Sequence, residues 1–181
     1  MRSASSLCTL RRVTHSQLPP KPASESRVEM TEIVLPGHTN QLGTIFGGQL
    51  MAWIDIAGSI ASARHARGVC VTASLDALHF VAPVQLGQHV NILACVNYAG
   101  TTSMEIGARL ESEDPTSGQR THVATAYLTF VAIDEQKRPR PVPPLLPQTP
   151  EEKRRYHHAE LRRESRLRLK AALAQKRAGE A

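Results

Sequence analysis

The chain has 181 residues, of which 41% are apolar, and a formal net charge of +6. This length suits one domain with terminal extensions, and no apolar run approaches the roughly 18 residues of a membrane span. The excess positive charge lies at the two ends, since residues 30–150 hold seven basic against nine acidic side chains, so a nucleic acid would have to bind the tails and none is expected.

Residues 1–27 are rich in Ser and Arg and hold no acid before Glu25. Mitochondrial presequences and disordered extensions share this composition, and we expect one of the two. The three cysteines are far apart and form neither a disulfide framework nor paired metal spacing, which is typical of a reducing compartment. The expected location is the cytoplasm, or the mitochondrion if the segment is a presequence.

Residues 28–35 alternate and carry β-branched side chains, which predicts a strand that ends at Pro36. Residues 36–46 are predicted to form a loop. A helix follows over residues 47–67 and is apolar on nearly every side, which is typical of a buried helix.

Four further strands are predicted over residues 69–80, 89–100, 103–114 and 122–134. Because no second helix is available before residue 151, the sheet must be largely antiparallel and must curl around the one helix. The sequence therefore predicts an α+β hotdog fold, with a five-stranded sheet wrapped around a long central helix, for a domain spanning residues 28–146.

Proline-rich residues 138–150 are predicted to leave the domain as an extended arm. In residues 147–181 this linker leads into a charged C-terminal helix, whose acids come first and bases last, as suits the helix dipole. A solvated or partner-packing helix is favoured over a nucleic-acid arm.

The segment "NQLGTIFGGQLMAWID" places one carboxylate, that of Asp55, among apolar residues of the predicted helix. Burying a carboxylate without partners costs free energy, so we expect this residue to have a specific role. A partly desolvated aspartate can act as a general base toward water. The alternative is a structural carboxylate held by a backbone amide or by Arg64.

Gly47 and Gly48 open the same helix, where the first amides have no intrahelical acceptor and can stabilise an oxyanion. Alternatively, the two glycines only allow tight packing of the loop. Asn40 could hold a carbonyl or a water, although a turn or cap role is more usual for such a residue. Gly48 and Asp55 are separated by a rise of roughly 10 Å, so either the substrate spans them or Asp55 serves the glycines of another chain.

The segment "HTNQLGTIFGGQLMAWID" resembles the N-x-x-G-x-x-F-G-G-x-x-M-x-W-x-D motif of the acyl-CoA thioesterases of the YciA and brain acyl-CoA hydrolase type. Three more segments match the family in the same order, and the resemblance runs from about Val28 to Leu146. They are "TASLDALHFVAPVQLGQHV" (72–90), "GTTSMEI" (100–106) and "AYLTFVAIDEQKRPRPVP" (126–143).

This resemblance implies hydrolysis of acyl-CoA to a free acid and coenzyme A, as in fatty acid metabolism, with no cofactor and no metal. Asn40 and the amides of Gly47 and Gly48 would polarise the thioester carbonyl. Asp55 of the facing protomer would activate water or attack directly to give an anhydride. The implied assembly is a homo-oligomer, a dimer that forms a trimer of dimers.

For coenzyme A, the resemblance points to Thr102, Ser103, Arg138 and Arg140, with Arg64 as a further candidate. Guanidinium groups suit phosphates, and a merely basic linker is the alternative. The alternative function is a non-catalytic acyl-CoA-binding or regulatory hotdog protein.

Overall fold

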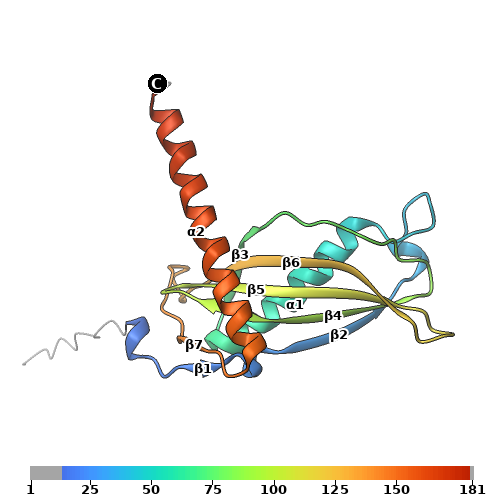
Figure 1. Cartoon of the computed structure of the whole chain (residues 1–181), viewed down its shortest axis with the longest axis horizontal. Coiled ribbons are helices and arrows are strands. Elements are labelled where there is room, and N and C mark those ends of the chain that lie inside the picture. Colours follow the sequence, from blue (N-terminus) through green and yellow to red (C-terminus); the bar gives the residue numbers. More distant parts are fainter. Residues whose placement is uncertain (1–13, 180–181) are drawn as a thin grey trace, which may run out of the picture.

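The structure, a computed structural model, describes residues 14–179. Within this part of the chain, five antiparallel strands form one curved sheet against the long helix α1 (Gly47–Ala66), as Figure 1 shows. The strands lie in the spatial order β2-β4-β5-β6-β3. The hotdog fold expected from the sequence is thereby confirmed. The strands are β2 (Val28–Ile33), β3 (Cys70–Leu75), β4 (His89–Ala99), β5 (Ser103–Glu113) and β6 (Arg120–Ala132).

A second long helix, α2 (Pro150–Gly179), crosses the outer face of the sheet, which is the face turned away from α1 (Figure 1). Two short strands, β1 (Lys21–Pro22) and β7 (Leu145–Leu146), pair in parallel at one end of the molecule. The remaining described elements are single 3-10 turns: η1 (His15–Gln17), η2 (Ala23–Ser26) and η3 (Pro36–His38).

The core lies between α1 and the inner face of the sheet. Alternate residues of the central strands point inward, so that Ile106 of β5 sits opposite Leu128 of β6, both buried. Small residues of α1 allow the helix to approach closely. Gly58 is required at one of these positions, because a Cβ there would lie 2.8 Å from the ring of Phe130.

Helix α1 is not buried on all sides, so the expectation of a fully buried helix is wrong for the single chain. Ile54 is fully buried and Trp53 packs against the ring of His38, whereas Met51, Ile56 and Ile60 are 45%, 48% and 38% exposed. The physical reason is that one curved sheet covers one side of a helix. An apolar stripe therefore faces outward.

Strand β3 is shorter than the predicted strand over residues 69–80. A bulge interrupts its pairing with β6 between Thr72 and Ser74. Beyond Leu75 the chain keeps single contacts with β6, such as the hydrogen bond from the Asp76 amide to the Tyr127 carbonyl at 2.9 Å. β3 lies at the edge of the sheet and exposes most of its residues.

Residues 21–26 fold onto the domain, unlike the extension expected for residues 1–27. Ser26 in η2 is fully buried, and its hydroxyl accepts a hydrogen bond from the Val96 amide of β4 at 2.9 Å. The ammonium of Lys21 donates to the His65 carbonyl at 3.0 Å, in the last turn of α1. The presequence hypothesis concerns residues 1–27, and the first 13 of these lie outside the described residues.

The proline-rich segment after β6 also stays with the domain instead of leaving it. Its first part returns to the sheet, since the Val142 amide donates to the Thr101 carbonyl at 3.0 Å. Val142 is fully buried, and Leu145 in β7 is 9% exposed. Proline prevents a regular ladder here, but it does not prevent an extended chain from packing on the end of α1.

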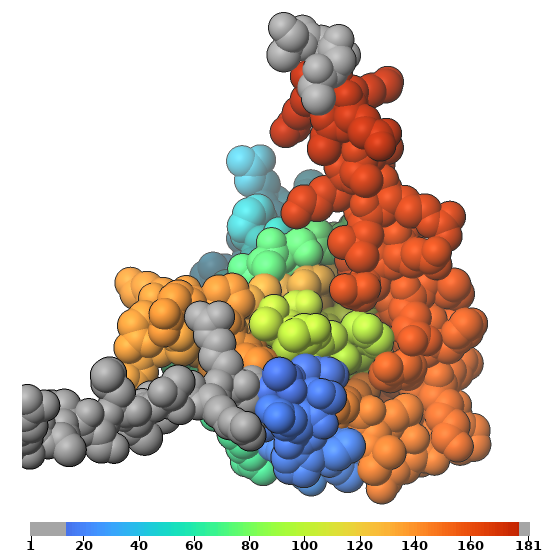
Figure 2. All heavy atoms as spheres, turned by 90° about the vertical axis from the view of Figure 1, so that its left-hand side faces the viewer, coloured from blue at the N-terminus to red at the C-terminus, as the bar shows by residue number. Residues whose placement is uncertain are grey.

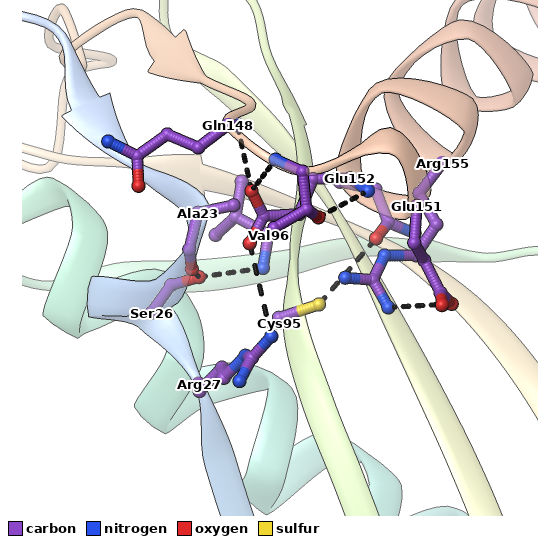
Figure 3. A network of polar contacts seen from close by, with 11 residues as sticks. Ala23, Ser26, Arg27, Cys95, Val96, Gln148, Glu151, Glu152 and Arg155 are labelled. Carbon is purple, nitrogen blue, oxygen red and sulfur yellow. Dashed lines mark hydrogen bonds and ion pairs between the residues drawn. The ribbon is translucent and has the colours of Figure 1, made fainter.

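The start of α2 is fixed by a capping network that also involves Arg27, the residue just before β2 (Figure 3). The Glu152 carboxylate accepts hydrogen bonds from the amides of Gln148 and Thr149, at 2.8 and 3.1 Å. In return, the Glu152 amide donates to the Thr149 hydroxyl at 3.1 Å. Arg27 pairs with the same carboxylate at 3.9 Å. These contacts hold the pKa of Glu152 below its usual range, against the opposing effect of burial.

Further along, α2 is held by a buried carboxylate of the sheet. Glu105 of β5 is 2% exposed, and its two oxygens pair with Arg162 at 2.6 Å and with Arg166 at 3.0 Å. Arg166 also pairs with Asp76 at 2.6 Å. Exposed pairs contribute about 0–1 kcal/mol each, but a buried carboxylate must be paired. The first half of α2 therefore belongs to this domain, while Leu169 and Leu173 further on are exposed.

No helix within residues 14–179 is both long enough and apolar enough to cross a bilayer.

His65 near the end of α1 is fully buried, and its Nε2 lies 2.9 Å from the Pro143 carbonyl oxygen. That contact requires a proton on Nε2, and Nδ1 is buried with no hydrogen-bond partner among the described residues. Burial lowers the pKa of His65, and the nearby Lys21 and His15 act in the same direction. The hydrogen bond to Pro143 and the charge of Glu25 oppose this lowering. The folded state therefore holds a neutral imidazole.

We predict that acid destabilises the fold through this histidine. Below its ordinary pKa of about 6.5, His65 takes up a proton in the unfolded chain but not in the folded one, so the free energy of unfolding falls by up to about 1.4 kcal/mol per pH unit. Above about pH 6.5, His65 is neutral in both states and does not change the free energy of unfolding with pH. Thermal unfolding between pH 5 and 8 should show a smaller acid loss in His65→Gln than in the wild type. The exposed His158→Gln is the control, and an equal acid loss in His65→Gln would contradict the prediction.

Candidate active site

Helix α1 begins at Gly47, after the N-cap residue Phe46, which provides no side-chain cap. Within residues 14–179, the amides of Gly47 and Gly48 donate to no protein acceptor, whereas the next amide, that of Gln49, bonds the Phe46 carbonyl at 2.9 Å. Two donors thus remain at the positive end of a twenty-residue helix. Such a position can bind a carbonyl oxygen that gains negative charge.

Two phenyl rings pack on these glycines. A Cβ at Gly47 would lie 3.3 Å from the ring of Phe80, and one at Gly48 would overlap the ring of Phe46. The packing role considered from the sequence is therefore present. It does not remove the free amides, and it places apolar surface beside them, since Phe46 and Phe80 are 60% and 43% exposed.

Asp55 lies two turns further along α1, on its outward face, and it is exposed in the single chain. The expectation of a carboxylate buried within one chain is wrong, because α1 is covered on one side only. Its hydrogen-bond partner is Thr72 of β3, whose hydroxyl donates to Asp55 Oδ1 at 2.5 Å. The structural alternative involving Arg64 is also wrong, because the Arg64 guanidinium donates to the Arg27 carbonyl.

The Asp55 carboxylate has no ion-pair partner within residues 14–179, and Thr72 is its one hydrogen-bond donor there. One oxygen is thus oriented by a hydroxyl, and the other is open to a water or a ligand. An aspartate with this arrangement can accept a proton. Sequence reasoning missed Thr72, although it is the first residue of the second family-like segment.

Asn40 lies in the loop before α1 and is exposed. Its side-chain oxygen accepts a hydrogen bond from the Leu42 amide at 2.9 Å, and its amide nitrogen lies 3.0 Å from the Thr44 hydroxyl. Its backbone amide also bonds the Thr44 carbonyl at 2.8 Å. In the single chain, Asn40 therefore has the turn role that its loop position favours. This turn fixes the orientation of the amide.

The candidates for coenzyme A gather at the opposite end of α1. The Thr102 carbonyl and the Arg140 amide both bond to Ala132, at 3.0 and 2.9 Å, which places the β4–β5 turn beside the segment after β6. Figure 2 views this end of the molecule, with the β4–β5 turn in yellow-green and the segment after β6 in orange. Ser103 follows at the start of β5.

The arginines at this end differ in how far they are engaged. Arg140 donates to the Ala66 carbonyl at 2.8 Å and so caps α1, and Arg64 is held by the Arg27 carbonyl. Arg138 pairs with Asp134 at 3.0 Å, but its side chain is 63% exposed. Arg138 and Arg64 are thus exposed, whereas Arg140 is only partly exposed.

The candidate residues do not meet within one chain. Figure 1 shows the loop before α1 at one end of the sheet and the β4–β5 turn at the other, with α1 running between them. The rise from Gly48 to Asp55 is roughly 10 Å, and that from Asp55 to Ala66 is roughly 16 Å. One water cannot contact both the glycine amides and Asp55 of the same chain.

Apolar side chains surround Asp55 on the exposed surface. These are Met51, Ile56 and Ile60 of the α1 stripe, and the edge of β3, unpaired within residues 14–179, lies next to them, with Thr72 turned toward Asp55. Unpaired strand edges and apolar patches of this kind mark interaction surfaces. This α1–β3 surface, defined by Met51, Ile56 and Ile60 of α1 and by the edge of β3 at Thr72, thus has the character of an interface with Asp55 inside it.

Comparison with known proteins gives a consistent result. Residues 42–119 match the family model described as thioesterase superfamily. The uncharacterized acyl-CoA thioester hydrolase YkhA of Bacillus subtilis is 41% identical over 153 residues, which cover 83% of this chain and 89% of YkhA. Acyl-coenzyme A thioesterase 11 of Mus musculus is 37% identical over 158 residues, 87% of this chain. The chain spans 27% of the length of that mouse relative.

Solved structures agree with these relatives. A hexameric acyl-CoA thioesterase, solved in its apo form, has a TM-score of 0.82 at 40% sequence identity. The comparison covers 85% of this chain and 99% of the other. The acyl-CoA hydrolase of Staphylococcus aureus, solved with butyryl coenzyme A and coenzyme A, has a TM-score of 0.81 at 37% identity. That comparison covers 87% of this chain and 96% of the other.

The Staphylococcus aureus enzyme has also been solved with alanine in place of one asparagine, one aspartate or one threonine. In that enzyme the aspartate follows the asparagine by 15 positions, and the threonine follows the aspartate by 17. Asn40, Asp55 and Thr72 have the same two spacings here. With its fold and its relatives, this chain belongs to the thioesterase superfamily, among the hotdog-fold acyl-CoA thioesterases.

Proposed function

We propose that the protein hydrolyses acyl-CoA thioesters at a site shared by two copies of the chain. One copy supplies Asn40 and the amides of Gly47 and Gly48, and the other supplies Asp55 with Thr72. The observation that carries this proposal is the Asp55 carboxylate, which is oriented by Thr72 in the middle of an exposed apolar surface. A second copy that covers this surface would bring its own groups to a carboxylate that is then shielded from bulk water.

The chemistry needs one base and one oxyanion site. Asp55 removes a proton from a water, and the oxygen of that water attacks the thioester carbonyl carbon. The negative charge that develops on the carbonyl oxygen is stabilised by the Gly47 and Gly48 amides and by the Asn40 side-chain amide. The tetrahedral intermediate then expels the coenzyme A thiolate, which takes up the proton held by Asp55, and the carboxylic acid and the free Asp55 carboxylate remain.

Thr72 acts on the base and not on the substrate. Its hydroxyl is bonded to one oxygen of Asp55, so it fixes the direction in which the other oxygen points. Orientation of this kind is what places a general base within reach of its proton. Direct attack by Asp55 to give an anhydride is a second route that uses the same geometry.

We further propose that the coenzyme A phosphates bind near Arg138, with Thr102 and Ser103 as hydroxyl donors. Arg140 and Arg64 bond carbonyls of the chain, so they act first by holding this end of α1 in shape. The Staphylococcus aureus relative, which binds butyryl coenzyme A and coenzyme A, supports this substrate class.

The assembly that fits these groups is a dimer through the α1–β3 surface. The two β3 edges would join two sheets, and the exposed stripes of α1 would cover each other. The hexameric relative supports a further association into a trimer of dimers.

We predict that Asp55→Asn lowers kcat for acyl-CoA hydrolysis by about 10² or more, because the amide cannot accept the proton. The assay follows release of the free thiol from acyl-CoAs of increasing chain length. Asp114→Asn, in the β5–β6 turn, is the matched control and should retain wild-type activity. Full activity in Asp55→Asn would exclude this mechanism, and a wild type that binds acyl-CoA without releasing thiol would favour the non-catalytic alternative.

A second prediction separates the hydroxyl of Thr72 from its size. Thr72→Val keeps the shape but loses the donor to Asp55, so kcat should fall by about tenfold or more, with KM little changed. Thr72→Ser keeps the donor and should stay within a few-fold of the wild type. Steady-state kinetics of both variants, with their melting temperatures measured alongside, decide the question. Equal losses in the two variants would mean that Thr72 acts by packing alone.

A further inference from the structure

A second concave site lies on the outer face of the sheet, away from α1 and from the α1–β3 surface. It is a cavity of about 510 Å³ between α2 and strands β2, β4, β5 and β6. This volume falls in the range of about 300–1,000 Å³ that is usual for small-molecule sites. Figure 3 shows Arg27, Cys95, Glu151 and Arg155, four residues of its lining, near the start of α2.

The walls of this cavity are rich in guanidinium groups from two sides. The sheet side, including the residue just before β2, contributes two arginines, and α2 contributes three. Because each guanidinium presents up to five N–H donors in a plane, a set of this kind suits oxygen-rich anions. The five arginines are Arg27, Arg109, Arg154, Arg155 and Arg162.

Each of these arginines has a carboxylate neighbour, but a guanidinium has five N–H donors, so no pairing uses all of them. Arg162 holds Glu105 through two N–H groups, at 3.1 and 2.6 Å, and Arg109 holds Glu111 at 2.8 Å.

Glu151, which lines the cavity, presents one oxygen to both Arg154 and Arg155, at 3.4 and 3.2 Å. Arg27 has a carboxylate contact of 3.9 Å, beyond hydrogen-bond distance. Glu29 is the second carboxylate in the lining. The lining itself holds five guanidinium groups and two carboxylates.

The floor of the cavity adds neutral donors. Asn97 lies at the bulge of β4 and is 3% exposed, yet its side-chain nitrogen donates to no acceptor within residues 14–179. Its amide lies over Gly107, where a Cβ would overlap it. The bulge and the glycine thus place an amide donor in the cavity lining. Burial raises the pKa of the neighbouring Cys95 thiol, so the floor carries no thiolate that would repel an anion.

We propose that this cavity binds a small phosphate compound with more than one negative charge, of the diphosphate or phosphate-ester class. Arginines on both walls contact the phosphate oxygens, and the Asn97 amide donates to one of them from the floor. Leu93 and Val28 supply an apolar part of the lining, which suits an organic group carried by the phosphate. The site does not depend on the proposed hydrolysis, because none of its residues belongs to the catalytic set.

Isothermal titration of the full-length protein with inorganic pyrophosphate, at constant ionic strength, tests this site. We expect saturable binding to the wild type and a loss of about tenfold or more in affinity for the double variant Arg109→Ala with Arg154→Ala. Both side chains are more than half exposed, so the fold should tolerate their removal. The matched control is Arg120→Ala with Arg168→Ala, which removes two exposed arginines outside the cavity, each also paired with one glutamate.

Asn97→Ala tests the floor without a change in charge and should weaken pyrophosphate binding by several-fold, with its melting temperature as the fold check. The absence of saturable pyrophosphate binding to the wild type would overturn the proposal. Equal weakening in the two double variants would also overturn it, because that result indicates a diffuse field and not a site.

The source of the phosphate is decided in the same titration by adding free coenzyme A. If coenzyme A displaces pyrophosphate, and the cavity variant raises KM for acyl-CoA at unchanged kcat, the cavity holds the phosphates of the substrate from a neighbouring subunit. If coenzyme A leaves pyrophosphate bound, the site takes a separate phosphate compound. Either result supports the proposed chemistry.

Discussion

Helix α1 has more apolar surface than one five-stranded sheet can cover, and the rest of the structure depends on this constraint. Trp53 and Ile54 are buried within the chain, while Met51, Ile56 and Ile60 remain about half exposed. Fully burying a side chain of this size stabilises a protein by roughly 1.5–3 kcal/mol, so a partner over this stripe would gain several kcal/mol. Asp55 stands in the same stripe and would be shielded together with it. Association and chemistry are therefore coupled in one surface.

The opposite face of the sheet is covered by α2 of the same chain (Figure 1). There α2 is fixed at its start by the Glu152 cap and further along by Glu105, whose buried carboxylate binds two arginines of the helix. The N-terminal segment and the proline-rich segment close one end of α1 through Lys21 and Arg140. These contacts leave α1 and β3 as the uncovered side, and they leave the arginine-lined cavity beneath α2 as a separate concave site.

The sequence was sufficient to predict the order and type of the main elements, because alternating strands and a Gly-Gly helix start are local signals. It also identified Asp55 and the free amides at Gly47 and Gly48. It could not predict that Lys21 caps α1, or that Glu105 is held by Arg162, because these partners are 44 and 57 residues apart. The exposure of Asp55 was missed for a related reason, since an all-apolar helix pattern does not reveal whether its cover comes from the same chain. Thr72 was missed because a threonine in a strand is ordinary until the carboxylate opposite it is seen.

The central claim is that Asn40 and Asp55 of different chains form one site, and mixing of inactive variants tests it most directly. Asn40→Ala and Asp55→Asn would be purified separately, dissociated and reassociated together in equal amounts, and assayed for thiol release. A shared site predicts recovery of about one quarter of wild-type activity, because half of the dimers are then mixed and each mixed dimer has one intact site of two. If the site lay within one chain, no mixed dimer would contain an intact site. Activity that stays at the level of the separate variants, with mixed dimers shown to be present, would contradict the account.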